Sequence, residues 1–171
     1  MGLGVLGERV ARALAQFEVP INGWSRRPTA IDGGRAFTGV EQFNAFLGAS
    51  RVLVNLLPLT SDTTNLINKD TLARLQPGAY VINVARGAHL VDEDLLAAIA
   101  SGHVAGATLD VFRTEPLPAG HAFWSHPRIT ITPHTSARTL RDESIAQIAR
   151  KMAALERGEG VAGIVNPARG Y

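Results

Sequence analysis

Two near-continuous apolar runs constrain the fold more strongly than any other feature of the sequence. RVLVNLLP occupies positions 51–58, and AYVINVA occupies positions 79–85. A strand with one solvated face alternates apolar and polar residues, whereas a strand that is buried on both faces of a parallel sheet does not. The two runs therefore predict two strands of a parallel sheet, the first of which ends at Pro58.

Strand-like and helix-like stretches alternate along the whole chain. Further strands are expected over 19–24, 104–112 and 129–132, and further helices after the first glycines and over 41–47, 68–72, 92–100 and 138–157. Asn68 is the expected cap of one helix, Gly102 follows another, and residues 25–34 are expected to form a loop. This alternation predicts an α/β fold with a doubly wound parallel sheet, which carries functional groups at the carboxyl ends of its strands.

A glycine pattern opens the chain. Gly2, Gly4 and Gly7 form a Gly-x-Gly-x-x-Gly motif, and helical spacing of apolar residues follows it. In a dinucleotide-binding fold these glycines let a pyrophosphate approach the backbone at a helix N-terminus. The motif alone is a weak signal, because glycine makes up 17 of the 171 residues. Its place before a helix in an α/β chain predicts a Rossmann-like dinucleotide-binding fold.

The residues after the next predicted strand bear on the choice of cofactor. NAD-binding folds place an acid about 20 residues after the glycine loop, where it bonds a ribose hydroxyl. This chain has Ser25, Arg26 and Arg27 there instead. A guanidinium can bind a 2′-phosphate that a carboxylate would repel, so this segment favours NADP over NAD. The alternative is a solvated basic loop.

Arg86 directly follows the predicted strand over 79–85. Its fork of N–H donors suits the carboxylate of a 2-keto acid, with one donor free to reach the keto oxygen. The alternative is a structural ion pair with an acid of the helix that follows, Asp92, Glu93 or Asp94.

A histidine and two carboxylates follow the last two predicted strands. Asp110 ends one strand, Glu115 lies in VFRTEPLP, and His134 lies in TPHTSA. A carboxylate stabilises an imidazolium and fixes its tautomer, so such a pair can give a proton to a carbonyl that receives a hydride. The other four histidines are expected to be surface or packing residues: His89, His103, His121 and His126.

Composition excludes several other classes of function. The chain has no cysteine, which excludes disulfides and a thiol nucleophile, and the histidines lack metal-ligand spacing. A Gly-x-Ser-x-Gly elbow is also missing, which argues against a serine hydrolase. The net charge of +2 is too small to indicate nucleic acid, and no apolar run is long enough for a membrane span. A small-molecule substrate is therefore expected, with no metal, nucleic acid or membrane partner.

Taken together, the motifs resemble those of the D-isomer-specific 2-hydroxyacid dehydrogenases, and most of all the glyoxylate/hydroxypyruvate reductase A subgroup. The resemblance runs from residue 1 to residue 171. The segments that carry it are GLGVLG, WSRR, NLLPLT, INVARG, VDEDLL, LDVFRTEPLP, HPRITITPH and the terminal ARGY.

The resemblance implies a role for each motif residue. Arg86 would bind the substrate carboxylate and carbonyl, His134 would be the general acid and base, and Glu115 would be its partner. Asp110 would lie near the nicotinamide, and Arg26, with Ser25 and Arg27, would bind the 2′-phosphate. The other residues implied in cofactor binding are Gly2, Gly4, Val5, Leu6, Gly7, Leu57, Pro58, Thr60, Val84, Ala85, Arg86 and His134.

The resemblance also implies how the chain is divided. Residues 1–137 would be a dinucleotide-binding domain that lacks its first strand, with Met1 as the last residue of that strand. Residues 138–171 would be a return helix and tail that packs on a substrate domain. Members of the family carry that substrate domain largely before the glycine loop, so a truncated chain is expected.

The expected function is NADPH-dependent reduction of small 2-keto acids, glyoxylate and hydroxypyruvate to glycolate and glycerate. NADP(H) is expected to be preferred over NAD(H), in a cytoplasmic homodimer. Two alternatives stay open at this point. One is a non-catalytic dinucleotide-binding scaffold related to the dehydrogenases, and the other is that the 171 residues alone are an inactive fragment of a working enzyme.

Overall fold

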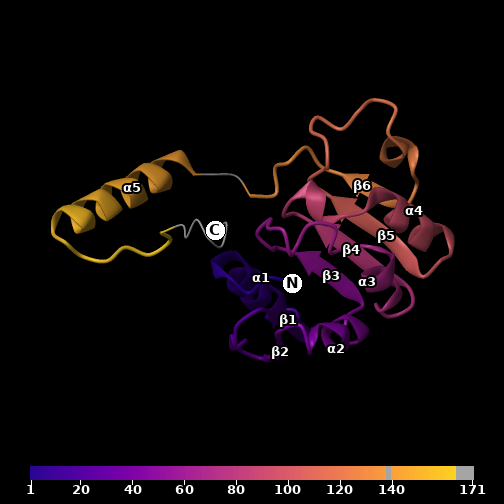
Figure 1. The fold of residues 1–171 in the computed structure, drawn as a ribbon, viewed down its shortest axis with the longest axis horizontal. Coiled ribbons are helices and arrows are strands. Elements are labelled where there is room, and N and C mark those ends of the chain that lie inside the picture. The colour runs from indigo at the N-terminus through magenta and orange to yellow at the C-terminus, as the bar shows by residue number, and fades with distance from the viewer. Residues whose placement is uncertain (138–139, 165–171) are drawn as a thin grey trace. The chain divides into compact units, whose positions relative to one another are not determined.

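The computed structural model describes residues 1–137 and 140–164, in two compact units, Met1–His134 and Thr135–Tyr171. The described helix of the second unit is α5 (Arg141–Glu156). The elements of the first unit, labelled in Figure 1, are α1 (Val5–Ala15), β1 (Ile21–Ser25), β2 (Gly34–Thr38), α2 (Phe43–Gly48), β3 (Val52–Asn55), α3 (Lys69–Ala73), β4 (Ala79–Asn83), α4 (Asp92–Ala100), β5 (Val104–Leu109) and β6 (Ile129–Ile131). Short 3-10 turns lie at Gly87–His89 and Ala122–Ser125.

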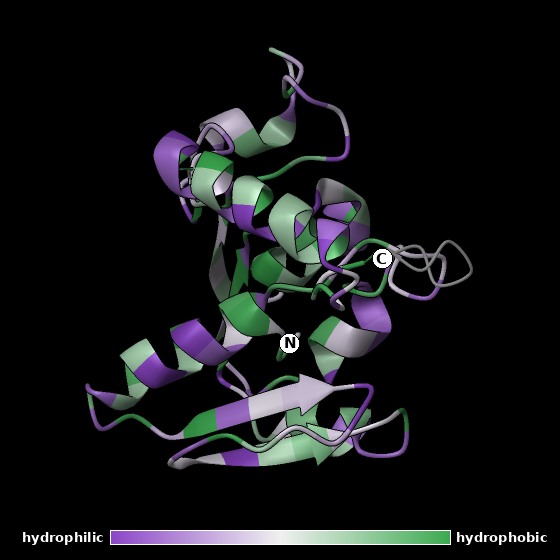
Figure 2. Cartoon of the chain, turned by 90° about the vertical axis from the view of Figure 1, so that its left-hand side faces the viewer, coloured by the Kyte–Doolittle hydropathy of each residue, from purple (hydrophilic) through white to green (hydrophobic). Residues whose placement is uncertain are grey.

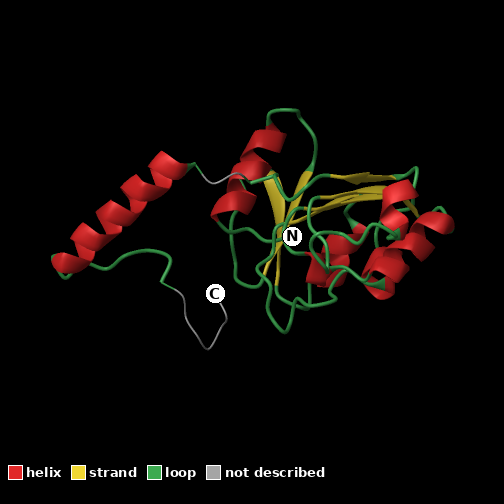
Figure 3. Ribbon diagram, turned by 90° about the horizontal axis from the view of Figure 1, so that it is seen from above, coloured by secondary structure: helices red, strands yellow, loops and turns green. Residues whose placement is uncertain are grey.

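All described strand pairs are parallel, and they form two sheets. One sheet has the order β1-β2, and the other has the order β3-β4-β5-β6. The backbone of Met1 and Gly2 lies between them: the Gly2 N–H donates to the Trp24 carbonyl (2.9 Å), and the Leu56 N–H donates to the Met1 carbonyl (3.0 Å). Helices flank the strands (Figure 3), so the predicted α/β fold with a parallel, Rossmann-like sheet is confirmed.

A groove of about 580 Å³ separates β1 from β3, and it explains a departure from the predicted burial. Leu53 in β3 is buried, but Val52 is 55% exposed because it lines this groove. The run over 51–58 was expected to be buried on both faces, and at β3 this is wrong for the groove side.

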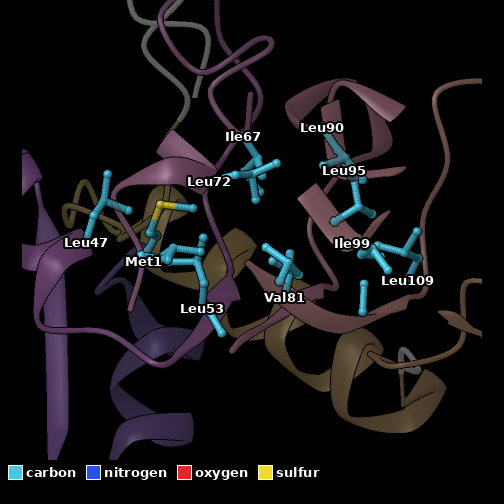
Figure 4. Packing of buried hydrophobic residues seen from close by; sticks show 14 of the residues in the cluster. Met1, Leu47, Leu53, Ile67, Leu72, Val81, Leu90, Leu95, Ile99 and Leu109 are labelled. Atoms are coloured by element: carbon cyan, nitrogen blue, oxygen red, sulfur yellow. The ribbon is translucent and has the colours of Figure 1, made fainter. Parts of the chain in front are cut away.

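The main core is one apolar cluster that includes Trp24 of β1 and Phe37 of β2 together with residues of the four-stranded sheet and its helices. Val81 of β4 packs in one cluster with Leu95 and Ile99 of α4 (Figure 4), and all three are fully buried. On β4 the alternate residues Tyr80 and Ile82 are only half-buried. Thus α4 covers one face of this strand, and the burial of its second face is weaker than the apolar run predicted.

Most predicted elements are present with ends that differ by a few residues. Asn68 caps α3 as expected, with its side chain accepting from the N–H groups of Asp70 and Thr71, and α4 spans the predicted residues 92–100. The missed element is β2 (Gly34–Thr38), which begins at the last residue of the loop expected over 25–34. Of its five residues only Phe37 is buried, so the stretch shows no apolar strand pattern.

Polar and apolar residues are interleaved along the helices (Figure 2). In α5 the residues predicted to share an apolar face are all more than half exposed: Ile145, Ile148, Met152 and Leu155. None of the described helices combines the length and the apolar content that a membrane crossing requires.

Candidate functional site

The chemically reactive residues predicted from the sequence follow the strands of the structure. Arg26 follows β1, Pro58 follows β3, Arg86 follows β4, Asp110 follows β5 and His134 follows β6. Because β3 to β6 are parallel neighbours in one sheet, the last four of these positions lie along the same edge of that sheet.

The glycine loop brings backbone close to backbone. Gly2 has a φ of +88°, and a Cβ built there would lie 2.9 Å from the carbonyl carbon of Leu56. A Cβ on Gly7 would lie 1.9 Å from the Gly2 carbonyl oxygen, so only glycine fits at this position. A Cβ on Gly4 would meet nothing within 4 Å, and Gly4 is the N-cap of α1 with no side-chain cap. The N–H groups in the first turn of α1, an eleven-residue helix, are therefore available to an anion. Val5 and Leu6 in this turn are exposed.

The turn after β1 presents two exposed arginines. The Ser25 hydroxyl donates to the Arg27 carbonyl (2.6 Å), which shapes the turn. Arg26 Nη1 lies 3.6 Å from a carboxylate oxygen of Asp62, which belongs to the segment after β3. The Ser25–Arg27 turn itself contains no acid, and the fold supplies one from a distant segment.

The segment after β3 is held by its own hydrogen bonds. The Thr60 N–H donates to the Thr63 hydroxyl (2.8 Å), and that hydroxyl donates to the Pro58 carbonyl (2.8 Å). Leu57 is also buried, so the segment after β3 is held in place at the carboxyl end of the sheet.

His134 and Glu115 form the predicted pair. His134 Nδ1 lies 2.8 Å from Glu115 Oε2, and the other carboxylate oxygen accepts from the Phe112 N–H (2.9 Å). The Phe112 N–H and the His134 ring hold the pKa of Glu115 below its usual range, and the charge of Arg86 acts in the same direction. His134 has a φ of 53°, a conformation that a non-glycine residue keeps where its surroundings impose it. Both side chains are partly exposed, so a small molecule can reach the pair.

Arg86 is exposed, with its guanidinium Nη1 donating to the Ala85 carbonyl (2.6 Å). Within residues 1–137 and 140–164 it forms no ion pair with the acids of α4. Asp92 lies instead 3.4 Å from His121 Nε2, and burial raises the pKa of Asp92. The expected surface or packing role of His121 is therefore incomplete, since this ring has a carboxylate partner.

Asp110 is buried, and the Thr132 hydroxyl donates to its carboxylate (2.5 Å).

The segment Val84–Arg86 after β4 is fixed by a hydrogen bond from the Ala85 N–H to the side chain of Asn83. Buried Asn55, Asn83 and His89 lie beneath these segments, and the sequence reading assigned them no part in the site. The available signal was a single asparagine inside each apolar run, at the residue where β3 or β4 ends. In the described part of the chain, no group of three or more His, Asp or Glu side chains could hold a metal ion.

Comparison with known proteins gives consistent matches. Residues 1–136 match the NAD binding domain of the D-isomer specific 2-hydroxyacid dehydrogenases. Over all 171 residues the chain is 52% identical to the glyoxylate/hydroxypyruvate reductase A of Serratia proteamaculans and 48% identical to that of Yersinia enterocolitica. The chain spans 55% of the length of each of these reductases.

Two solved structures extend the likeness to three dimensions. A D-isomer specific 2-hydroxyacid dehydrogenase from Xanthobacter autotrophicus Py2, in complex with NADPH and MES, superposes with a TM-score of 0.95 at 43% identity, over 99% of this chain and 70% of that one. The NADPH-dependent glyoxylate/hydroxypyruvate reductase of Sinorhizobium meliloti, in complex with NADP and sulfate, gives a TM-score of 0.95 at 36% identity, over 100% of this chain and 55% of that one.

Proposed function

Because this chain belongs to the D-isomer specific 2-hydroxyacid dehydrogenase family, we propose that it carries the NADPH-binding and catalytic part of a reductase of small 2-keto acids, with glyoxylate and hydroxypyruvate as substrates. The observation that carries the proposal is the His134–Glu115 pair, which lies at the same sheet edge as Arg86, the residue that follows β4. The reductases of Serratia and Sinorhizobium, which the chain resembles over its whole length, support the substrate class.

The residues present fit a dinucleotide. Gly2 and Gly7 make a backbone surface without side chains, and the uncapped start of α1 offers N–H donors to a pyrophosphate. Arg26 would bind the 2′-phosphate of NADPH, with Ser25 and Arg27 in the same turn. Support for NADPH over NADH also comes from the two superposed relatives, which hold NADPH or NADP.

Each catalytic residue then has one task. Arg86 binds the substrate carboxylate through paired N–H donors and polarises the keto oxygen. When bound, NADPH supplies the hydride that reduces the carbonyl carbon. His134 uses Nδ1 to hold Glu115, so its Nε2 is the nitrogen that gives a proton to the carbonyl oxygen. The carboxylate of Glu115 stabilises the protonated ring before the transfer.

Three further proposals come from the family likeness. Residues 138–171 form the return segment that packs on a substrate domain, the reductase is a homodimer, and it acts in the cytoplasm. The apolar residues exposed on α5 support the first of these, because a helix face of this kind is usually covered in a complete protein.

The test uses both the 171-residue chain and a chimera that adds the uncovered part of the Serratia reductase. NADPH binding is followed by fluorescence, and turnover of glyoxylate and hydroxypyruvate is followed by NADPH absorbance. The variant His134→Ala is expected to lower kcat by about 10²- to 10⁴-fold in whichever form is active, because the proton donor is lost. NADPH affinity should change by less than about twofold, since the pyrophosphate and 2′-phosphate groups bind elsewhere.

His126→Ala is the matched control, because His126 lies before β6 and, among the described residues, its ring accepts a hydrogen bond only from the nearby Arg128 N–H. Near-normal turnover in His134→Ala would contradict the mechanism. NADPH binding without turnover in both forms would favour a non-catalytic dinucleotide-binding scaffold instead.

A further inference from the structure

Three buried polar side chains meet beneath the proposed active site. Asn55 ends β3, Asn83 ends β4, and the two are register partners across the strand pair. His89 lies in the turn after Arg86, and none of the three side chains is exposed to solvent. A fully buried polar group requires hydrogen-bond partners, so the contacts of this Asn–Asn–His cluster (Asn55, Asn83 and His89) define what it holds.

The contacts fix the protonation state of His89. Asn55 Nδ2 donates to Asn83 Oδ1 (3.0 Å) and lies 2.9 Å from His89 Nδ1. An amide nitrogen can only donate, so His89 Nδ1 accepts and the ring proton is on Nε2. That Nε2–H then donates to the Pro58 carbonyl (3.3 Å). Burial lowers the pKa of His89, and the charge of Arg86 acts in the same direction, which keeps the ring neutral.

The cluster also reaches the backbone on both sides of the site. Asn55 Oδ1 accepts from the Leu57 N–H (3.2 Å), next to the bond from His89 to Pro58. Asn83 Nδ2 donates to the Arg86 carbonyl (3.1 Å), and its Oδ1 accepts from the Ala85 N–H (3.3 Å). One set of bonds therefore holds the segment proposed to line the cofactor, and the other set holds the arginine proposed to bind the substrate.

We propose that the Asn–Asn–His cluster sets the distance between the Leu57–Pro58 segment and Arg86, and that His89 is a positioning residue for substrate binding. The inference rests on the proposed function for the roles of these two segments. Apolar side chains could fill the same space without needing any polar partner, so packing alone does not explain the cluster. Its bonds end on the two site segments, where a shift of about 1 Å can lower the reaction rate about 100-fold.

His89→Phe tests the inference because it keeps a planar ring and removes both nitrogens. In the active form defined above, it is expected to lower kcat/KM for the keto acid about 10- to 100-fold, through a higher KM and a lower kcat. NADPH affinity should change by less than about threefold. His89→Gln carries both an acceptor and a donor, and it should recover most of the loss.

Tyr80→Phe is the structural control. It removes the hydrogen bond between the hydroxyls of Tyr80 and Thr108 in the same sheet (3.0 Å), which touches neither site segment. This variant should lower the thermal midpoint while leaving KM and kcat unchanged. A kinetic loss in Tyr80→Phe equal to that in His89→Phe would overturn the positioning role.

Two readouts on the 171-residue chain separate this inference from the proposed function. Amide exchange at Leu57 and Ala85 should be faster in His89→Phe and unchanged in Tyr80→Phe, whether or not the chain turns over substrate. Ring nitrogen NMR of the unaltered chain should place the His89 proton on Nε2, which requires no variant to fold. A proton on Nδ1, or unchanged exchange at both amides, would overturn the inference, whereas absent turnover alone would count only against the proposed function.

Discussion

Arg26 is the single residue on which the proposed cofactor preference most depends. It follows β1 in an exposed turn and lies 3.6 Å from Asp62. A guanidinium near one exposed carboxylate gains little from that pair, because water screens both charges. A 2′-phosphate offers more oxygen acceptors and more negative charge, so it should displace Asp62 from the arginine.

Arg26→Ala is therefore expected to weaken NADPH binding about 10- to 100-fold and to change NADH binding by less than about twofold. Asp62→Asn should strengthen NADPH binding by about two- to fivefold, because it removes a competing anion. Titrations with both cofactors measure these effects. Arg128→Ala removes the same charge from the loop before β6 and is the control. An equal loss for NADPH and NADH in Arg26→Ala would contradict the 2′-phosphate assignment.

The site residues differ in how far a sequence can predict them. The shared sheet edge of Arg86, Glu115 and His134 could be predicted because parallel strands bring their carboxyl ends to one edge, so position along the chain predicts position in space. Asp62 and His89 could not be identified, because their partners are distant in the chain and no local pattern marks the pairing. His89, for example, meets Asn55, which is 34 positions away.

At the scale of elements, the turn at Gly87–His89 packs directly on the segment after β5. A Cβ on Gly87 would lie 1.8 Å from the Phe112 carbonyl carbon and 2.3 Å from the Arg113 nitrogen. Those atoms are backbone, so no side-chain rotation can relieve the contact. This close approach joins the segment that carries Arg86 to the segment that carries Glu115.

Gly87→Ala is expected to force the two segments apart. The free energy of unfolding should fall by about 1–3 kcal/mol, as overpacking commonly causes, and turnover should fall with it because Arg86 and Glu115 separate. Chemical denaturation and steady-state kinetics measure the two effects. Gly120→Ala is the matched control in the segment after β5, because a Cβ there meets nothing within 4 Å. Equal stability in the two variants would show that the contact imposes no constraint.

The same scale explains which elements the sequence could predict. The apolar runs located β3 and β4 because both strands bury residues in the main core, Leu53 in β3 and Ala79 and Val81 in β4. The strand β2 depends on pairing with β1, from Ile21 with Gly34 to Ser25 with Thr38, and its side chains are mostly exposed. Such a strand is stabilised by pairing with its neighbour, so its own five residues show little of the apolar pattern that predicts a strand.

At the scale of the first unit, the two sheets differ in how much packing stabilises them. The β1–β2 sheet contributes Trp24 and Phe37 to the apolar cluster that the four-stranded sheet shares with α4, but the contact between β1 and β3 is interrupted by a groove of about 580 Å³. Local openings follow burial and packing, so the β1–β2 sheet is expected to open without the rest. Amides of β1 and β2 should exchange at least about tenfold faster than amides of β4 and β5.

Native-state hydrogen exchange at increasing denaturant measures this difference directly. Amides of β5 serve as the internal reference, because Ala107 and Leu109 are fully buried there. Identical opening free energies in both sheets would contradict the expectation and would mean that the groove does not weaken the coupling between them.

The separation of the sheets has a consequence for cooperativity. The proposed phosphate contacts lie at the Gly2–Gly7 loop and at Arg26, on the side of β1, while Arg86 and His134 follow strands of the other sheet. A dinucleotide that contacts both sides binds only the state in which both are folded, so its binding free energy adds to the coupling between them. At about 100 times its Kd, a ligand adds about 2.7 kcal/mol to the state that binds it. The cofactor would then make the two sheets, which otherwise open independently, unfold together. The folded fraction of the β1–β2 sheet would therefore report how much cofactor is bound.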